Sequence, residues 1–270
     1  MQNVYSSVTG SVPENYDRGL GPMYFADFAA DLAARIATGN PSRVLEIAAG
    51  TGIVSRLLRD VLSASVDLTV TDLNPPMLEV ARTKFADGER IAFQPADATA
   101  LPFPDHSFDA VACQFGVMFF PDKEASYREA YRVLSPGGRY VFSVWDSWRH
   151  NRIGALIDAT VAAFFPADPP TFFQAPFAYH LIDPIKEALI DTGFRDISIA
   201  VIRREQQIAD LPQFARGNTY GSPLVDQVRA RGGVDPDHLV AELERVIGRE
   251  FGTNPCRVPL QAIVFEATRR

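Results

Sequence analysis

Between residues 42 and 145, short apolar runs alternate with segments whose apolar residues recur at helical spacing. The apolar runs occupy residues 43–47, 66–71, 91–93, 108–115 and 139–145, and the third run is the weakest. Nearly continuous apolar character is typical of strands in a sheet that is covered on both faces. The pattern therefore predicts five strands in this block.

Amphipathic segments separate these runs. Ile53, Leu57, Leu58 and Val61 follow helical spacing, and residues 76–86 resemble a helix with proline in its first turn. Asp122 can cap a further helix, which residues 135–138 would end. Strands that alternate with helices in this way predict a parallel sheet with right-handed crossovers.

The flanking segments have a different character. Residues 24–37 place apolar residues on one helical stripe, and residues 146–180 are rich in aromatic residues and proline. Residues 181–192 predict a helix that Gly193 ends, and the alternating residues 197–201 and 258–264 predict two strands. Residues 208–252 contain helical stretches such as 239–246. We therefore expect seven strands, with a helical excursion before the last one.

Composition limits the possible classes of protein. The 270 residues are 47% hydrophobic and 22% charged, which is ordinary for a globular protein. The formal net charge of −7 argues against nucleic acid and anionic membranes as partners. We see no signal peptide, no apolar run long enough to span a membrane, and no metal-ligand spacing around Cys113 and Cys256. We expect a cytoplasmic protein without a metal, with Cys113 buried in the core, and leave its oligomeric state open.

The richest candidate chemistry follows the first predicted strand. Residues 44–54 run from a strand through small residues, including Gly50 and Gly52, into a helix. Small residues let a ligand approach the backbone, and a helix N-terminus offers free N–H groups. Asp72 closes the second strand, where a carboxylate can bind the two hydroxyls of a ribose.

The loop does not fit two common nucleotide-binding patterns. A dinucleotide fingerprint needs a third glycine where this chain has Ser55, and a P-loop needs a lysine that does not follow these glycines. A small adenosine ligand without a pyrophosphate remains as the best candidate.

Four segments resemble the class I S-adenosylmethionine-dependent methyltransferases, and within them the ubiquinone/menaquinone-biosynthesis C-methyltransferases. These segments are VLEIAAGTG (44–52), TDLNPPML (71–78), QPADATALPFPDHSFDAVACQFGVMFFPD (94–122) and RVLSPGGRYVFSVW (132–145). One departure is that Ala48 stands where the family loop often has its first glycine. We expect a tight but intact loop, because alanine is the smallest replacement. The resemblance fades after residue 150, so it does not identify the substrate.

The resemblance implies S-adenosylmethionine as cofactor and S-adenosylhomocysteine as product. It implies roles for individual residues, grouped by the part of the ligand they would meet. The methionine end would meet Glu46 and the backbone of Ala48, Gly50 and Gly52; the ribose would meet Asp72; adenine would meet Leu73, Met77, Asp97 and Ala98; the sulfonium and methyl would face Gln114 and Phe115; and Tyr16 would fold over the ligand as a lid.

The resemblance also implies a Rossmann-like α/β fold with a seven-stranded, mostly parallel sheet, an antiparallel last strand and a helical cap insertion. We expect one domain over residues 1–270. Its parts would be an N-terminal helical lid (1–41), a cofactor-binding core (42–145), a substrate-side segment with the sixth strand (146–207), a helical insertion (208–257) and the last strand (258–270).

Each proposed role has a plainer alternative. Glu46 can serve as a loop or cap acceptor, and Asp72 and Asp97 can simply form turns. Met77 can be core, Gln114 can satisfy the backbone, and Tyr16 can anchor the N-terminus.

Methyl transfer from a sulfonium is an in-line displacement in which positioning is the main task. An oxygen or carbon acceptor can still need a base, and His150 and His180 are the candidates, whereas His106 and His238 are expected in solvent. Aromatic residues gather after the fourth and fifth strands, as core or as a pocket wall. As substrate contacts we select Phe119, Trp145, Phe177 and His180. We expect a small apolar or aromatic acceptor, under a cap that excludes water.

Rival functions predict different behaviour. A non-catalytic or regulatory protein would bind S-adenosylmethionine without turnover. A nicotinamide-dependent oxidoreductase is disfavoured by Ser55, and a macromolecular methyltransferase is disfavoured by the acidic charge balance.

Overall fold

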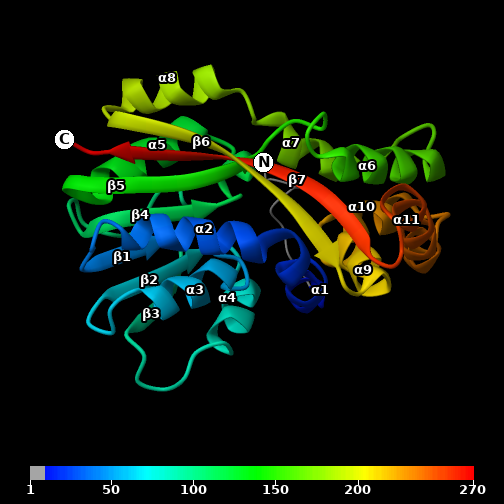
Figure 1. Cartoon of the computed structure of the whole chain (residues 1–270), viewed down its shortest axis with the longest axis horizontal. Coiled ribbons are helices and arrows are strands. Elements are labelled where there is room, and N and C mark those ends of the chain that lie inside the picture. The colour runs from blue at the N-terminus through cyan, green and yellow to red at the C-terminus, as the bar shows by residue number, and fades with distance from the viewer. Residues whose placement is uncertain (1–9) are drawn as a thin grey trace.

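One mixed seven-stranded sheet forms the centre of the computed structural model, which describes residues 10–270 (Figure 1). The strands are β1 (Arg43–Glu46), β2 (Asp67–Asp72), β3 (Ile91–Pro95), β4 (Phe108–Gln114), β5 (Leu134–Trp145), β6 (Arg195–Ile208) and β7 (Cys256–Thr268). Their order is β3-β2-β1-β4-β5-β7-β6. Neighbours among the first five strands pair in parallel, and β7 pairs antiparallel with both β5 and β6. The predicted fold class and the antiparallel last strand are thus confirmed.

The apolar runs have the structural role that their pattern predicts. Val44 and Leu45 of β1 are both fully buried, yet they belong to two different core clusters. Successive side chains of a strand point to opposite faces, so a strand covered on both sides needs apolar residues at every position. Cys113 of β4 is fully buried, as expected, and forms no disulfide.

Helices cover both faces of the sheet. Most buried apolar residues of α2 (Ala26–Ala37) and α3 (Ile53–Val61) lie in the cluster that contains Val44, with Phe28 as an exception. Those of α5 (Lys123–Val133) and α8 (Ile182–Thr192) lie in the cluster that contains Leu45. Short α4 (Pro75–Arg82) follows β2. The Asp122 side chain accepts a hydrogen bond from Ala125 N at 2.8 Å at the start of α5, and Gly193 ends α8 at φ 114°. Both predicted helix ends are therefore confirmed.

Several boundaries differ from the prediction. The helix expected from residue 24 begins as a π-helical turn, Gly21–Phe25, and continues as α2 from Ala26. Pro22 has no N–H to donate, which disturbs regular helical hydrogen bonding there. Residues 11–20 contain an unpredicted helix, α1 (Val12–Gly19), and α6 (Arg152–Phe164) lies in the segment that composition alone described. Strand β5 starts at Leu134 instead of residue 139, so residues 135–138, which were expected to end the preceding helix, belong to the strand.

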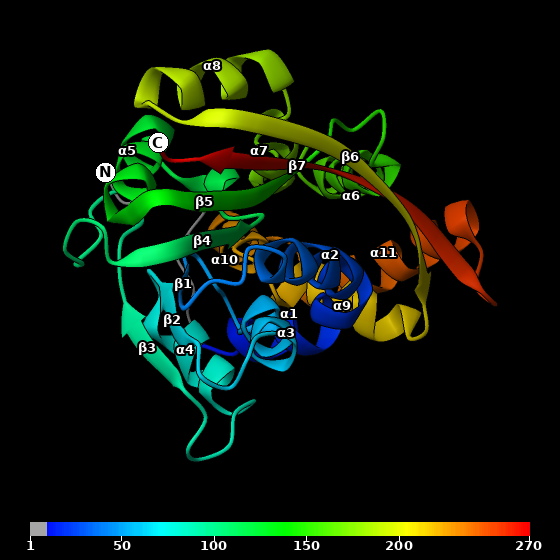
Figure 2. The same cartoon turned by 60° about the vertical axis from the view of Figure 1, so that its left-hand side comes forward.

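A second group of helices lies beyond one end of the sheet (Figures 1 and 2). It comprises α6, α9 (Leu211–Tyr220), α10 (Leu224–Arg231) and α11 (Pro236–Phe251), with the short turns Val117–Phe119 and Phe172–Gln174 and helix α7 (Ala175–Ala178) nearby. The long strands β6 and β7 reach out to this group, as Figure 2 shows. We call α6, α9, α10 and α11 the cap. None of the described helices combines the length and apolar character that a membrane crossing requires.

Candidate active site

A cavity of about 620 Å³ lies where the parallel strands end and the cap begins. Its walls include residues that end or follow β1, β2, β3, β4 and β5, together with residues of α1, the π-helical turn and α9. Open α/β sheets bind ligands at this carboxyl edge. The cavity therefore lies where the sequence placed the candidate site.

The loop between β1 and α3 has an unusual backbone. Ala48, Gly50 and Gly52 all have positive φ angles, of 53°, 56° and 78°. A Cβ at position 52 would lie 2.8 Å from the Ala81 Cβ, so glycine is required there by space as well as by conformation. Ala48 and Gly50 line the cavity, whereas Gly52 stands behind them at the start of α3.

Ala48 fits because its neighbour is a glycine. A Cβ on Gly116 would lie 2.6 Å from the Ala48 Cβ, closer than real Cβ atoms approach one another. The missing side chain at position 116 leaves room for the methyl group at position 48. The Cys113 Sγ, at 2.9 Å from the same Cβ position, excludes a side chain there as well.

Asp72 is held rigidly at the end of β2. Its Oδ2 accepts a hydrogen bond from Gly50 N at 2.8 Å, and its Oδ1 accepts from Asn74 N at 2.8 Å. Burial raises the pKa of this carboxyl, and these hydrogen bonds oppose that rise. Asp72 lines the cavity with only 7% of its surface exposed. Asp72, which the sequence analysis expects to bind the ribose, thus presents a fixed carboxylate to the cavity.

Glu46 is buried directly before the loop. Only 1% of its surface is exposed, and Oε2 has no hydrogen-bond partner among the described residues. Burial raises the pKa of Glu46 to about 8, with the nearby charge of Asp72 adding to the effect. Glu46 does not line the cavity itself. A buried, unpartnered carboxyl of this kind is suited to a cationic group brought close by a ligand.

Asp97 and Ala98 follow β3 and both line the cavity. Asp97 is exposed, and its Oδ1 accepts hydrogen bonds from Thr99 N at 2.8 Å and Thr99 Oγ1 at 2.7 Å. The structure therefore shows the turn-forming role for Asp97 together with a position on the cavity wall.

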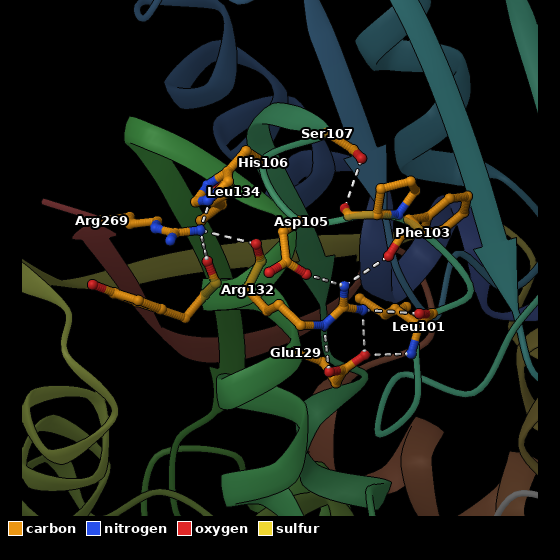
Figure 3. A network of polar contacts seen from close by, with 11 residues as sticks. Leu101, Phe103, Asp105, His106, Ser107, Glu129, Arg132, Leu134 and Arg269 are labelled. Carbon is orange, nitrogen blue, oxygen red and sulfur yellow. Dashed lines mark hydrogen bonds and ion pairs between the residues drawn. The ribbon is translucent and has the colours of Figure 1, made fainter.

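A polar network holds the loop that carries these residues (Figure 3). Arg132 of α5 donates to the carbonyl oxygens of Phe103 at 2.7 Å and Leu101 at 2.9 Å. Glu129 accepts from Arg132 Nε at 2.8 Å and from Leu101 N at 2.6 Å. Arg132 also pairs with Asp105 at 2.9 Å. The loop between β3 and β4 is thus fastened to α5 by its backbone.

Leu73 and Met77 form an apolar wall after β2. Leu73 is 53% exposed and lines the cavity, while Met77 is 8% exposed beside it. A large exposed leucine at a cavity edge is an available surface for an apolar ligand face.

Aromatic side chains form another part of the wall. Phe115 follows β4 at φ 53° and stacks on Trp145 at 3.8 Å between ring centroids, with an interplanar angle of 9°. Gln114 also lines the cavity, and its Nε2 donates to the Phe25 carbonyl at 3.1 Å. This is the backbone-satisfying role considered above, but Gln114 Oε1 remains without a partner among the described residues.

Two of the other selected substrate contacts reach the cavity. Phe119 and Phe177 line it, and the Phe177 ring lies against α6 at Gly154. A Cβ on Gly154 would lie 2.4 Å from Phe177 Cε2. Gly154 therefore sets how far this ring can withdraw from the cavity.

The two histidine candidates lie elsewhere. His150 is exposed, and His180 is partly buried with Nδ1 2.8 Å from the Phe177 carbonyl oxygen. Neither histidine lines the cavity. The titratable side chains among its described lining residues are Tyr16, Tyr24, Asp72 and Asp97.

Tyr16 of α1 lies over the β1–α3 loop. Its Cε1 is 3.9 Å from the Cβ position of Gly50, and its ring stacks on Phe25 at 5.2 Å. Asp17 pairs with Lys84 after α4, which ties α1 to the core. Close contact of Gly19 with Gly217 ties α1 to α9. The placement leaves open both the lid and the anchor interpretation of Tyr16.

Sequence reasoning missed several lining residues. Tyr24, Asn218, Ser222 and Leu260 come from the π-helical turn, the end of α9, the loop after it, and β7. These residues lie far apart along the chain and belong to no motif. The general expectation of a cap was the only signal for them.

Comparison with known proteins adds the family. Residues 45–142 match the model described as a methyltransferase domain. A demethylmenaquinone methyltransferase of Thermus thermophilus is 46% identical over 114 residues, which cover 42% of this chain and 50% of that protein. The ubiquinone/menaquinone biosynthesis C-methyltransferase UbiE of Pseudomonas syringae pv. tomato is 31% identical over 180 residues, 62% of this chain and 69% of the relative. A demethylmenaquinone methyltransferase of Deinococcus radiodurans is 36% identical over 180 residues, 60% of this chain and 72% of the relative. The chain thus spans half the length of the Thermus relative.

Solved structures share the fold. The YcgJ protein of Bacillus subtilis superimposes with a TM-score of 0.58 at 20% identity, covering 90% of this chain and 99% of that one. Phosphoethanolamine N-methyltransferase 2 of Haemonchus contortus, in complex with S-adenosyl-L-methionine, gives 0.59 at 18% identity, covering 95% and 56%. Fold and strand-end site together define the class I methyltransferase architecture. The chain belongs to the S-adenosylmethionine-dependent methyltransferases of the UbiE type.

Proposed function

We propose that this protein transfers the methyl group of S-adenosylmethionine to a small, apolar aromatic acceptor. The observation that carries the proposal is one continuous cavity with two unlike halves. The half that we call the cofactor half presents Asp72 and the loop after β1 with its positive φ angles. The half that we call the acceptor half presents the stacked pair Phe115 and Trp145. A methyl donor and an apolar acceptor require such neighbouring sites.

The residues in and behind the cofactor half fit the cofactor. The fixed carboxylate of Asp72 suits the ribose hydroxyls. Glu46 ends β1 outside the cavity lining, and its unpartnered Oε2 suits the ammonium of the methionine end. Leu73 and Met77 offer apolar surface for adenine. When bound, the cofactor supplies an activated methyl group on a sulfonium.

The chain's own task is to position the reactants and exclude water. Well-oriented reactants gain up to about 7–11 kcal/mol from positioning alone. Phe115, Trp145 and Phe177 form a wall that would keep water away from the acceptor. No histidine or lysine lines the cavity among the described residues, so the proposal assigns no general base.

The acceptor class rests on the wall and on the relatives' names. Those names refer to ubiquinone and menaquinone biosynthesis and support a ring-containing acceptor. The formal net charge of −7 favours a small molecule over a nucleic acid. The comparisons offer no support for a non-catalytic protein.

Calorimetric titration with S-adenosylmethionine and S-adenosylhomocysteine tests the first half of the proposal. Micromolar binding of both is expected. Aromatic acceptors are then screened for formation of S-adenosylhomocysteine. Cofactor binding without turnover on any small acceptor would favour the non-catalytic alternative, and turnover on protein or RNA alone would contradict the acceptor class.

A further inference from the structure

Two side chains in the acceptor half of the cavity have hydrogen-bonding capacity that no protein group uses. They are Tyr24, from the π-helical turn Gly21–Phe25, and Gln114, at the end of β4. The turn connects them, because Gln114 Nε2 donates to the carbonyl of Phe25, the residue after Tyr24. Single π-helical turns inside longer helices often occur at functional sites.

The Gln114 amide has a fixed orientation. Its bond to the Phe25 carbonyl, at 3.1 Å, requires the NH₂ group on that side. Oε1 is consequently directed away from this carbonyl, and it is a buried atom without a partner among the described residues. A buried amide oxygen without a partner costs free energy unless a ligand donor or water reaches it.

The Tyr24 hydroxyl is committed as a donor. It donates to Asn218 Oδ1 at 3.4 Å, and the Asn218 amide is fixed by its own bond from Nδ2 to the Phe214 carbonyl at 2.8 Å. Burial raises the pKa of Tyr24, so its hydroxyl stays protonated. With its hydrogen used, the oxygen of Tyr24 can only accept a further hydrogen bond.

We propose that Tyr24 and Gln114 form an acceptor-recognition pair that selects aromatic substrates bearing a hydrogen-bond donor, such as a hydroxyl or amino group. Both side chains offer oxygens, so a ring with only carbonyl or ether oxygens gains nothing from them. This inference rests on the proposed function and deepens it by naming what the acceptor site recognises.

Three related probes test the pair: 1-naphthol, 1-methoxynaphthalene and naphthalene. Their binding is measured by calorimetry on protein saturated with S-adenosylhomocysteine. Wild-type protein should bind 1-naphthol about tenfold more tightly than the other two, as expected for one or two hydrogen bonds. Tyr24→Phe and Gln114→Leu should each lose most of this preference while keeping the affinity for naphthalene.

A third variant reverses the preference rather than removing it. Asn218→Leu takes away the acceptor of the Tyr24 hydroxyl hydrogen. Tyr24 could then donate to the oxygen of a ligand, so 1-methoxynaphthalene should gain affinity relative to naphthalene. A merely structural role for Asn218 would weaken all three probes alike.

Tyr127→Phe is the matched control. Tyr127 is fully buried, bonds Tyr179 Oη at 2.9 Å and does not line the cavity, so its variant should keep the wild-type preference. Thermal unfolding checks that each variant is folded. The pair is overturned if wild-type protein shows no preference, if 1-naphthol does not bind, or if Tyr24→Phe or Gln114→Leu retains the full preference. Failure to bind S-adenosylhomocysteine would instead refute the proposed function.

Discussion

The two halves of the cavity are built in contrasting ways. In the cofactor half, backbone geometry and hydrogen bonds fix the loop and its carboxylate, as in the bond from Gly50 N to Asp72. In the acceptor half, packing between aromatic rings fixes the side chains, as in the stack of Phe115 on Trp145. The first half is assembled from consecutive strand ends. The second combines the π-helical turn, β4, β5, α7 and the cap. A common reaction can therefore be encoded locally, while substrate recognition depends on tertiary packing.

The largest expected effect removes the carboxylate of the cofactor half. Asp72→Ala should weaken binding of S-adenosylhomocysteine at least about tenfold. The substitution removes the charge-assisted hydrogen bonds expected to the ligand, and it also removes the acceptor of the Gly50 N–H. Calorimetry measures this effect. Asp67→Ala, at the other end of β2 in an exposed ion pair with Arg90, is the control and should bind normally. Unchanged affinity in Asp72→Ala would remove this residue from the site.

The second variant acts on the acceptor half alone. Gly154→Ala places a Cβ 2.4 Å from Phe177 Cε2, so the ring must shift. We expect naphthalene binding to weaken about fivefold, since overpacking typically costs about 1–3 kcal/mol. Binding of S-adenosylhomocysteine should stay constant. Ala159→Val, on an exposed position of the same helix, is the control. A parallel loss of both ligands would show that the halves are not separable.

A third prediction concerns pH and the cofactor half. The pKa of Glu46 is about 8 in the folded protein against an ordinary 4.5, so between these values the folded protein keeps a proton that the unfolded chain releases. Glu46 therefore lowers stability progressively as pH rises through this window. Relative to wild type, Glu46→Gln should gain a few degrees in melting temperature between pH 5 and pH 9. Exposed Glu79→Gln should show no such trend. A pH-independent difference for Glu46→Gln would contradict the assignment.

The smallest effect is expected at the two histidines. His150 and His180 do not line the cavity, so replacing either with alanine should change the rate of S-adenosylhomocysteine formation by less than about twofold. The rate is measured with whichever aromatic acceptor the screen identifies. A loss of a hundredfold or more at either residue would place a base in the acceptor half after all.

The same contrast explains what the sequence could predict. The alternation of strands and helices and the positions of Gly50 and Asp72 follow from short patterns that local physics enforces, whereas the antiparallel β7 was expected only from the family resemblance. Helix α1 was missed although Ser11, Pro13 and Glu14 follow a common helix-start pattern, and α6 was missed in a segment that was described by its composition alone. Tyr24 and Asn218 meet across 194 positions of sequence, which no local pattern records.

The crowding around Gly116 has a consequence for the mutational tolerance of the site. A Cβ at position 116 would lie 2.6 Å from the Ala48 Cβ and 2.9 Å from the Cys113 Sγ. Exchanging Ala48 for glycine would therefore not by itself make room for a side chain at position 116. Position 116 accepts a larger residue only if both neighbours change together, so this position is closed to single substitutions.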